Sequence, residues 1–171
     1  MSNFNLAFEN VLKNEGGFTN DPQDSGGATN WGITIHDLSV YLRRSASVEE
    51  VRRMSKLTAR AIYKSKYWDS LSLDAVNDDG VALVIFDQGV LRGIGTIARA
   101  VQRILGVVVD GHFGPKTLAA INAADPGWLI TKIEQQAEEA YREIVRRSPK
   151  NQKFLKGWIN RAKRLLNWIK K

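Results

Sequence analysis

Cysteine is absent from the 171-residue chain, which excludes disulfide bonds, thiolate metal ligands and a thiol nucleophile. Histidine is scarce: the two that occur, His36 and His112, lie far apart in sequence and lack the spacing of metal ligands. We therefore expect no metal site and no cofactor, and we interpret both histidines as surface or packing residues.

Long apolar runs are missing as well. The longest, Val81–Phe86 and Val107–Val109, are far too short to cross a bilayer. The N-terminus has no basic segment followed by an apolar one, and Glu9 stands where a signal peptide would be most hydrophobic. We expect a soluble protein made in the cytoplasm without a signal peptide, so a substrate outside the cytoplasm would require another factor to release it.

Acidic residues are missing from the C-terminal end, where the positive charge gathers. Lys150–Lys171 holds eight of the 25 Lys and Arg residues and no Asp or Glu, which leaves 17 basic and 18 acidic residues elsewhere. This near-neutral remainder, without a nucleic-acid-binding motif, argues against a nucleic-acid partner. The tail is either an ordinary packed helix with a solvated basic face or a helix attracted to an anionic polymer or membrane surface.

Apolar residues recur at helical spacing through most of the chain, so we predict an all-α fold. One predicted helix, 81–91, is apolar on most sides and should lie at the centre, which makes its polar members Asp87 and Gln88 unusual. They either tie down a loop or face a cleft. Capping and turn residues delimit the other predicted helices at residues 4–14, 34–43, 58–68, 96–105 and 126–146, with further starts after Ser47, at Pro115 and near Gln152.

The segment 15–34 is the most distinctive part of the chain. It combines two Gly-Gly pairs with a proline, two aspartates, two asparagines and a tryptophan. Such a loop bends sharply and holds polar groups in an exposed place. Glu15 at its start suits general acid catalysis on a sugar. Alone it would be interpreted as a solvated helix-end residue, but the adjoining loop favours the catalytic interpretation.

Several motifs of the chain occur together in one known family. They are Glu15-Gly16-Gly17, Asn20, Asp24, Gly26-Gly27, Thr29, Gly32-Ile33-Thr34, Tyr67-Trp68, Phe86-Asp87, Val107, Asp110-Gly111, Gly114-Pro115 and Thr117. In these motifs the chain resembles the glycoside hydrolase family 108 N-acetylmuramidases, which include phage-type endolysins and secretion-activator-like proteins. The resemblance implies a lysozyme-like helical bundle with a glycine-rich catalytic loop, and cleavage of the β-1,4 bond between N-acetylmuramic acid and N-acetylglucosamine. It also implies that Glu15 is the general acid.

The same resemblance implies a division of the chain. Residues 1–93 would form the muramidase catalytic region, and residues 94–171 a helical peptidoglycan-binding-like region packed with it as one compact unit. The implied partners are peptidoglycan glycan strands. We expect the protein to be a monomer that acts on them in the periplasm after another factor releases it. One position departs from the pattern: relatives are expected to carry Val-Asn after the Phe-Asp pair, where this chain has Val90-Leu91 and then Arg92. Glycan contacts would differ there.

Spacing adds a second resemblance. Eight residues separate Glu15 from Asp24, and four separate Asp24 from Thr29, similar to the Glu–Asp–Thr arrangement of phage lysozymes, which usually have five in the second gap. We therefore take Glu15, Asp24 and Thr29 as catalytic candidates. Asp24 is equally suited to holding the loop in an Asx-turn. The candidate substrate-binding residues are Asn20, Asp21, Gly26, Gly27, Trp31, Tyr67, Trp68 and Gln88.

Several alternatives stay open. Asp21 is a second candidate for the carboxylate beside Glu15, and retention or inversion depends on a carboxyl separation that sequence does not give. Core packing competes with sugar stacking for Trp31, Tyr67 and Trp68. A lytic transglycosylase also uses a lone glutamate. A non-catalytic, wall-binding secretion-assisting protein and a cationic membrane-active protein are the rivals outside enzymology.

Overall fold

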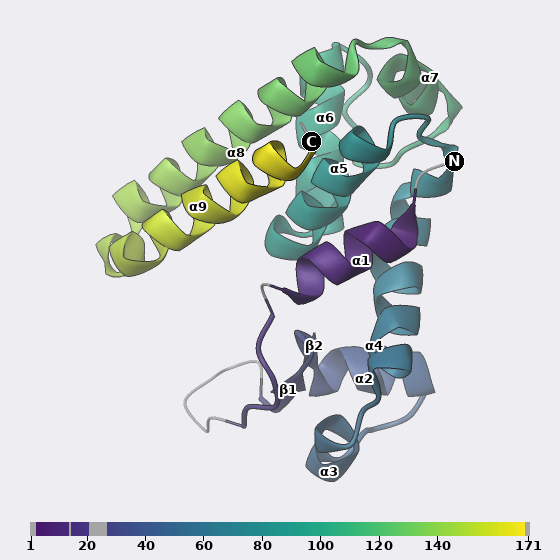
Figure 1. The fold of residues 1–171 in the computed structure, drawn as a ribbon, viewed down its shortest axis with the longest axis vertical. Helices are drawn as coiled ribbons and strands as arrows, with labels where there is room; N and C mark the ends of the chain where they lie inside the picture. Colours follow the sequence, from purple (N-terminus) through teal and green to yellow (C-terminus); the bar gives the residue numbers. More distant parts are fainter. Residues whose placement is uncertain (1–2, 14, 21–26, 170–171) are drawn as a thin grey trace. The chain divides into compact units, whose positions relative to one another are not determined.

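A computed structural model describes residues 3–13, 15–20 and 27–169, with side chains up to Ala162. It has an all-α fold of the lysozyme-like type, as predicted (Figure 1). The chain forms two compact units, Phe4–Ser70 and Leu71 onward, and each is described by itself. Within the described residues, no helix is both long and apolar enough to span a membrane.

The first unit contains the loop of interest. Its elements are α1 (Phe4–Leu12), β1 (Thr29–Asn30), β2 (Ile33–Thr34), α2 (Ile35–Leu42), α3 (Val48–Arg52), α4 (Lys56–Tyr63) and the π-helical η1 (Lys64–Trp68). An aromatic cluster forms its core: the rings of Phe4 and Trp68 meet edge to face at 5.3 Å, and those of Phe8 and Tyr63 lie 5.6 Å apart. Burying such rings is the largest apolar contribution available to so small a unit.

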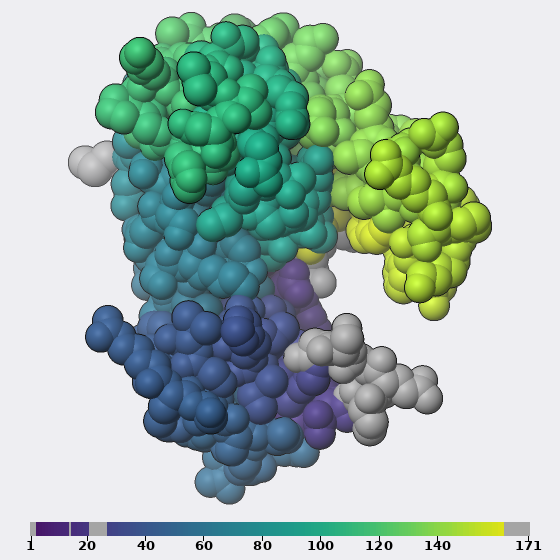
Figure 2. Space-filling model, turned by 180° about the vertical axis from the view of Figure 1, so that it is seen from behind, coloured from purple at the N-terminus to yellow at the C-terminus, as the bar shows by residue number. Residues whose placement is uncertain are grey.

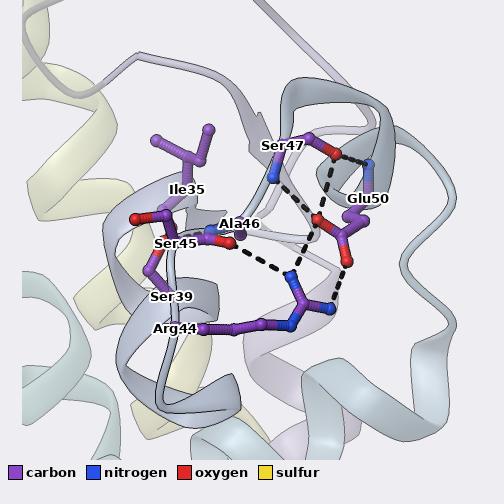
Figure 3. Close-up of polar contacts among 7 residues, drawn as sticks. All are labelled: Ile35, Ser39, Arg44, Ser45, Ala46, Ser47 and Glu50. Atoms are coloured by element: carbon purple, nitrogen blue, oxygen red, sulfur yellow. Dashed lines mark hydrogen bonds and ion pairs between the residues drawn. The ribbon is translucent and has the colours of Figure 1, made fainter.

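The turn between α2 and α3 is fixed by local polar contacts (Figure 3). Ser47 and Glu50 form a capping box, which confirms the predicted helix start after Ser47. Arg44 donates to both carboxylate oxygens of Glu50, at 2.5 and 3.3 Å. These bonds from Arg44 and those from Ser47 lower the pKa of the Glu50 carboxyl to about 2. The hydroxyl of Ser39 accepts from the backbone N–H of Ala46 and closes the turn.

The second unit is built on α5 (Asp79–Arg92), whose residues from Val81 to Gly89 are all buried. This confirms the central position that its apolar sequence predicts. Helix α6 (Ile94–Leu105) and the long helix α8 (Pro126–Arg147) pack against it, and α9 (Gln152–Ile169) runs alongside α8 (Figure 1). The short elements are η2 (Asp69–Leu71), η3 (Leu73–Ala75), α7 (Pro115–Ala123) and η4 (Pro149–Asn151).

Two predicted boundaries are wrong. Gly93 follows the last residue of α5, and α6 begins at Ile94 rather than at Thr96, so Gly95 lies inside α6. The helix predicted over 58–68 starts at Lys56 after the N-cap Ser55, and its last turn widens into the π-helical η1. Local signals did locate several other ends. Pro115 is the first residue of α7 as predicted, Asp78 and Asp125 cap α5 and α8, and Gly106 ends α6 at φ 68°.

The Asp110-Gly111 motif serves as a structural turn. Buried Gln102 donates to the Asp110 carboxylate at 2.7 Å and to the carbonyl of His112 at 2.8 Å. Its own amide oxygen accepts from the backbone N–H of Gly111 at 2.9 Å. One glutamine therefore satisfies the polar groups of the loop that joins α6 to α7.

Asp87 is fully buried on α5, and its charge is neutralised by an arginine that lies much later in the sequence. Arg161 of α9 donates to its carboxylate from Nε at 3.0 Å and from Nη2 at 2.9 Å. Asp87 has 0% exposed side chain and Arg161 9%, so water screens the pair little. Arg161 is thus one basic residue of the C-terminal segment that does not lie on the surface.

Packing divides the chain at residues 70–71, whereas the boundary predicted from the sequence, at 93–94, separates two regions of different expected function. Helix α5 causes the difference, because it packs against α6 and α8 and therefore belongs with the residues that follow it.

Removing one partner of the buried ion pair should destabilise the protein far more than removing both. Arg161→Met takes the cation away from the buried Asp87 carboxylate and should lower the free energy of unfolding by about 3–5 kcal/mol. The double variant Asp87→Leu/Arg161→Met should recover most of that loss. Urea denaturation followed by circular dichroism measures both, and a double variant no more stable than Arg161→Met would contradict the ion-pair interpretation.

Candidate active site

Glu15 follows the end of α1, which is anchored by its buried face. Phe4, Ala7, Phe8 and Val11 are each at most 5% exposed. The backbone N–H of Glu15 donates to the carbonyl of Leu12 at 3.2 Å, so the chain is still held to the last helical turn. Glu15 itself is half-buried. Its backbone position is therefore set by the packing of the helix before it.

A two-residue hairpin forms the opposite side of the site. Strands β1 and β2 pair antiparallel with Asn30 opposite Ile33. The turn residues Trp31 and Gly32 both have positive φ, 54° and 72°, as in the mirror-image turn that suits the twist of a short hairpin. A bridge joins Thr19 to Thr29 through backbone bonds of 2.8 and 2.9 Å, and their hydroxyl oxygens lie 2.7 Å apart.

Gly32 is the point where three elements meet. A Cβ atom at this residue would lie 2.6 Å from Oε2 of Glu15 and 2.5 Å from the hydroxyl oxygen of Tyr63. Only glycine leaves room for that approach. The Tyr63 hydroxyl donates to the carbonyl of Trp31 at 3.1 Å. The carboxyl of Glu15 and the hydroxyl of Tyr63 thus both approach the open side of Gly32.

The hairpin is fastened to the chain that follows it. The indole N–H of Trp31 donates to the carbonyl of Met54 at 3.1 Å, and the amide of Asn30 donates to the carbonyl of Val51 at 3.0 Å. Trp31 is half-buried, so the contact supports a packing role and leaves part of the ring exposed. These bonds explain how a turn with a strained non-glycine residue persists.

The other candidates are distributed as follows. Asn20 is exposed, and Gly27 has a φ of 67°. Tyr67 is half-buried, with its ring 5.6 Å from that of Tyr63. Asp21, Asp24 and Gly26 lie outside the described residues. Within the described part of the chain, no three His, Cys, Asp or Glu side chains are grouped to hold a metal ion.

Two substrate-binding assignments need correction. Trp68 is 1% exposed and packs on Phe4, so its ring belongs to the core. Gln88 is 0% exposed and accepts from the hydroxyl of Tyr141 at 3.0 Å. Neither side chain offers a surface to a glycan. Sequence reasoning also missed Tyr63, whose one signal was its position four residues before Tyr67 on the same helix face.

Comparisons with known proteins agree on two segments. Residues 8–93 match the family model described as Glycosyl hydrolase 108, and residues 97–163 match the one described as Predicted Peptidoglycan domain. A solved structure described as "Structure of Brucella abortus SagA" is 31% identical, with a TM-score of 0.83, and the match covers 97% of this chain and 92% of that one. None of the curated proteins compared with the chain matches it.

Alanine at Gly32 should be costly, whereas alanine at Gly16 should not. Gly32→Ala combines a positive φ with a close approach to Glu15, and we expect a loss of about 1–3 kcal/mol in unfolding free energy. A Cβ at Gly16 meets nothing within 4 Å, so the matched Gly16→Ala should stay within about 0.5 kcal/mol of wild type. Thermal and urea unfolding measure both, and equal losses would show that the crowding at Gly32 is unimportant.

Proposed function

The chain belongs to the glycosyl hydrolase 108 family and is a peptidoglycan hydrolase, and we propose that it cleaves the β-1,4 bond between N-acetylmuramic acid and N-acetylglucosamine with Glu15 as general acid. The observation that carries this proposal is the position of the Glu15 carboxyl, which closely approaches the side of Gly32 where a Cβ atom would stand. A general acid needs a fixed position more than it needs any one partner.

In the proposed reaction, the carboxylic acid of Glu15 protonates the glycosidic oxygen as the bond to the muramic acid ring breaks. Positive charge develops at the ring carbon, where a second polar group stabilises it or orients the attacking water. We assign that role to Asp24, with Asp21 as the alternative carboxylate. Thr29, whose hydroxyl pairs with that of Thr19, would hold the loop that presents them.

The glycan would lie along the loop that follows Glu15. We propose that Asn20, Asp21, Gly26, Gly27, Trp31 and Tyr67 contact it. Two features support this path. Asn20 is exposed, and the space beside Gly16 and Gly17 is free of other described atoms within 4 Å of an added Cβ. A sugar next to Glu15 would require such room.

Glu15→Gln should abolish wall hydrolysis without unfolding the protein. The amide keeps the shape of the side chain but has no proton to donate, so we expect at least a roughly 100-fold loss of rate. Glu9→Gln is the matched control, because Glu9 lies on the exposed face of α1 in an ion pair with Lys56. Clearing of purified peptidoglycan measures the rate, and a Glu15→Gln variant as active as Glu9→Gln would exclude Glu15 as the acid.

Mass spectrometry of the same digests separates the enzymatic rivals. Hydrolysis leaves a reducing muramic acid end, whereas a lytic transglycosylase leaves an anhydro sugar that is one water lighter. Binding without any product in wild-type digests would favour the wall-binding, secretion-assisting alternative.

We also propose that a monomer reaches anionic wall polymers through its basic C-terminal segment. Lys150, Lys153 and Lys156 are exposed. The segment that carries them is coloured yellow-green in Figure 2. Lys163, Arg164, Lys170 and Lys171 lie beyond the described side chains.

The triple variant of Lys150, Lys153 and Lys156 to Gln should bind peptidoglycan more weakly at low salt and lose much of its dependence on salt concentration, since exposed charges are screened. Cleavage of short soluble glycans should be unchanged. Pull-down on sacculi at several salt concentrations measures the effect, and a wild-type salt profile would leave these lysines as a solvated surface.

A further inference from the structure

Helix α8 carries a glutamate on its buried face. Glu134 lies between Ile133 and Ala137 on the side that packs inward and is only 6% exposed. Both of its carboxyl oxygens are buried, and neither has a hydrogen-bond partner among the described residues. Buried polar groups without partners cost free energy, so such a carboxyl needs an explanation.

A cavity opens beside this carboxyl. Its volume is about 160 Å³, similar to that of cavities known to hold a small organic molecule. One side carries oxygen atoms, from Glu134, Glu138 and Thr131, which follow one another by about one turn of α8. The other walls are apolar and come from Tyr141, Ile159 and Ala162.

Among the residues that the structure describes, the charges around the cavity leave Glu134 without a cation of its own. Burial and the nearby Asp87 carboxylate raise its pKa to about 7, and Arg92 opposes this rise. Arg161 is bonded to Asp87, and Arg92 donates to the amide oxygen of Gln136 at 2.9 Å. The described charged or titratable groups around this region are Asp87 and Arg92 of α5, Glu138 and Tyr141 of α8, and Arg161 of α9, and Glu138 is itself paired with Arg142.

We propose that this cavity binds a primary ammonium group carried on an aliphatic chain, with Glu134 as its counter-ion. An ammonium has three N–H donors. Both oxygens of Glu134 and one of Glu138 or Thr131 accept them, while the chain lies against Ile159 and Ala162. A divalent metal ion fits less well, because no three acidic or histidine ligands come together in the described residues.

The position of the cavity in the sequence indicates which molecule supplies the ammonium group. This assignment rests on the proposed function. All its lining residues fall within residues 97–163, the segment matched to the Predicted Peptidoglycan domain. Peptidoglycan stem peptides contain a diamino acid whose side chain ends in an amine when it is not cross-linked. We assign the site to that free amine.

The site itself is tested with n-butylammonium as the probe, titrated into the full chain and followed by NMR. Binding should perturb amides of α8 around Glu134 and tighten between pH 6 and 8, as the carboxyl loses its proton. Glu134→Gln should weaken it at least about tenfold, which corresponds to 1.4 kcal/mol. The matched control Glu139→Gln, exposed on the same helix, should bind as wild type does.

Three results would overturn the site. They are equal binding of n-butanol, tighter binding of Mg²⁺ at the same residues, and unchanged affinity in Glu134→Gln. Ala162→Leu provides a second route, because it fills the cavity without touching the carboxyl and should also exclude the probe. Circular dichroism establishes that each variant is folded.

The source is tested on sacculi with their free amines intact or acetylated, in the Glu15→Gln background so that the substrate is not consumed. Acetylation should weaken binding of this variant and have no further effect when Glu134→Gln is added. Equal binding to both substrates would overturn the stem-peptide assignment. If Glu15 is not the general acid, Glu15→Gln will still clear peptidoglycan, whatever the binding experiment gives. The two failures are therefore distinguishable.

Discussion

The buried ion pair between Asp87 and Arg161 is a central constraint on the second unit. A helix buried as completely as α5 has no water to solvate a carboxylate, so the charge must be met by protein. The partner comes from 74 residues further along the chain, on α9. This pair ties α9 to α5, and it leaves Glu134 near a carboxylate that is already paired. The ammonium cavity is therefore a consequence of how one buried carboxylate is satisfied.

In the unit Phe4–Ser70, the main constraint around the candidate site is steric. Gly32 allows the hairpin turn, the hydroxyl of Tyr63 and the carboxyl of Glu15 to approach within the space of a missing methyl group. A carboxyl held this way loses little further freedom when substrate arrives, which is the advantage of preorganised catalytic groups. The first Gly-Gly pair gives no such evidence of crowding, because an added Cβ at Gly16 or Gly17 would meet no other described atom within 4 Å.

The sequence predicted those features whose causes are local. Caps such as Asp78 and Ser47 act within three residues, so helix starts could be located without knowledge of the fold. Long-range partners could not. Nothing near Asp87 in sequence indicates Arg161, although an arginine on the apolar face of a predicted helix was a signal of burial. Trp68 and Gln88 were misassigned because aromatic and amide side chains serve cores and binding sites equally well.

The two segments matched to known families are not two independent bodies. Asp87 belongs to the segment 8–93 and Arg161 to the segment 97–163, so the ion pair joins the hydrolase match to the peptidoglycan-domain match. The packing of the chain leads to the same conclusion, because α5 belongs to the compact unit that starts at Leu71. A chain cut between the two matches would lose α6, α8 and α9, which expose the apolar surface of α5 when they are removed, and it would also lose the arginine that pairs with Asp87. Separating catalysis from wall binding in this protein therefore requires point substitutions rather than truncation.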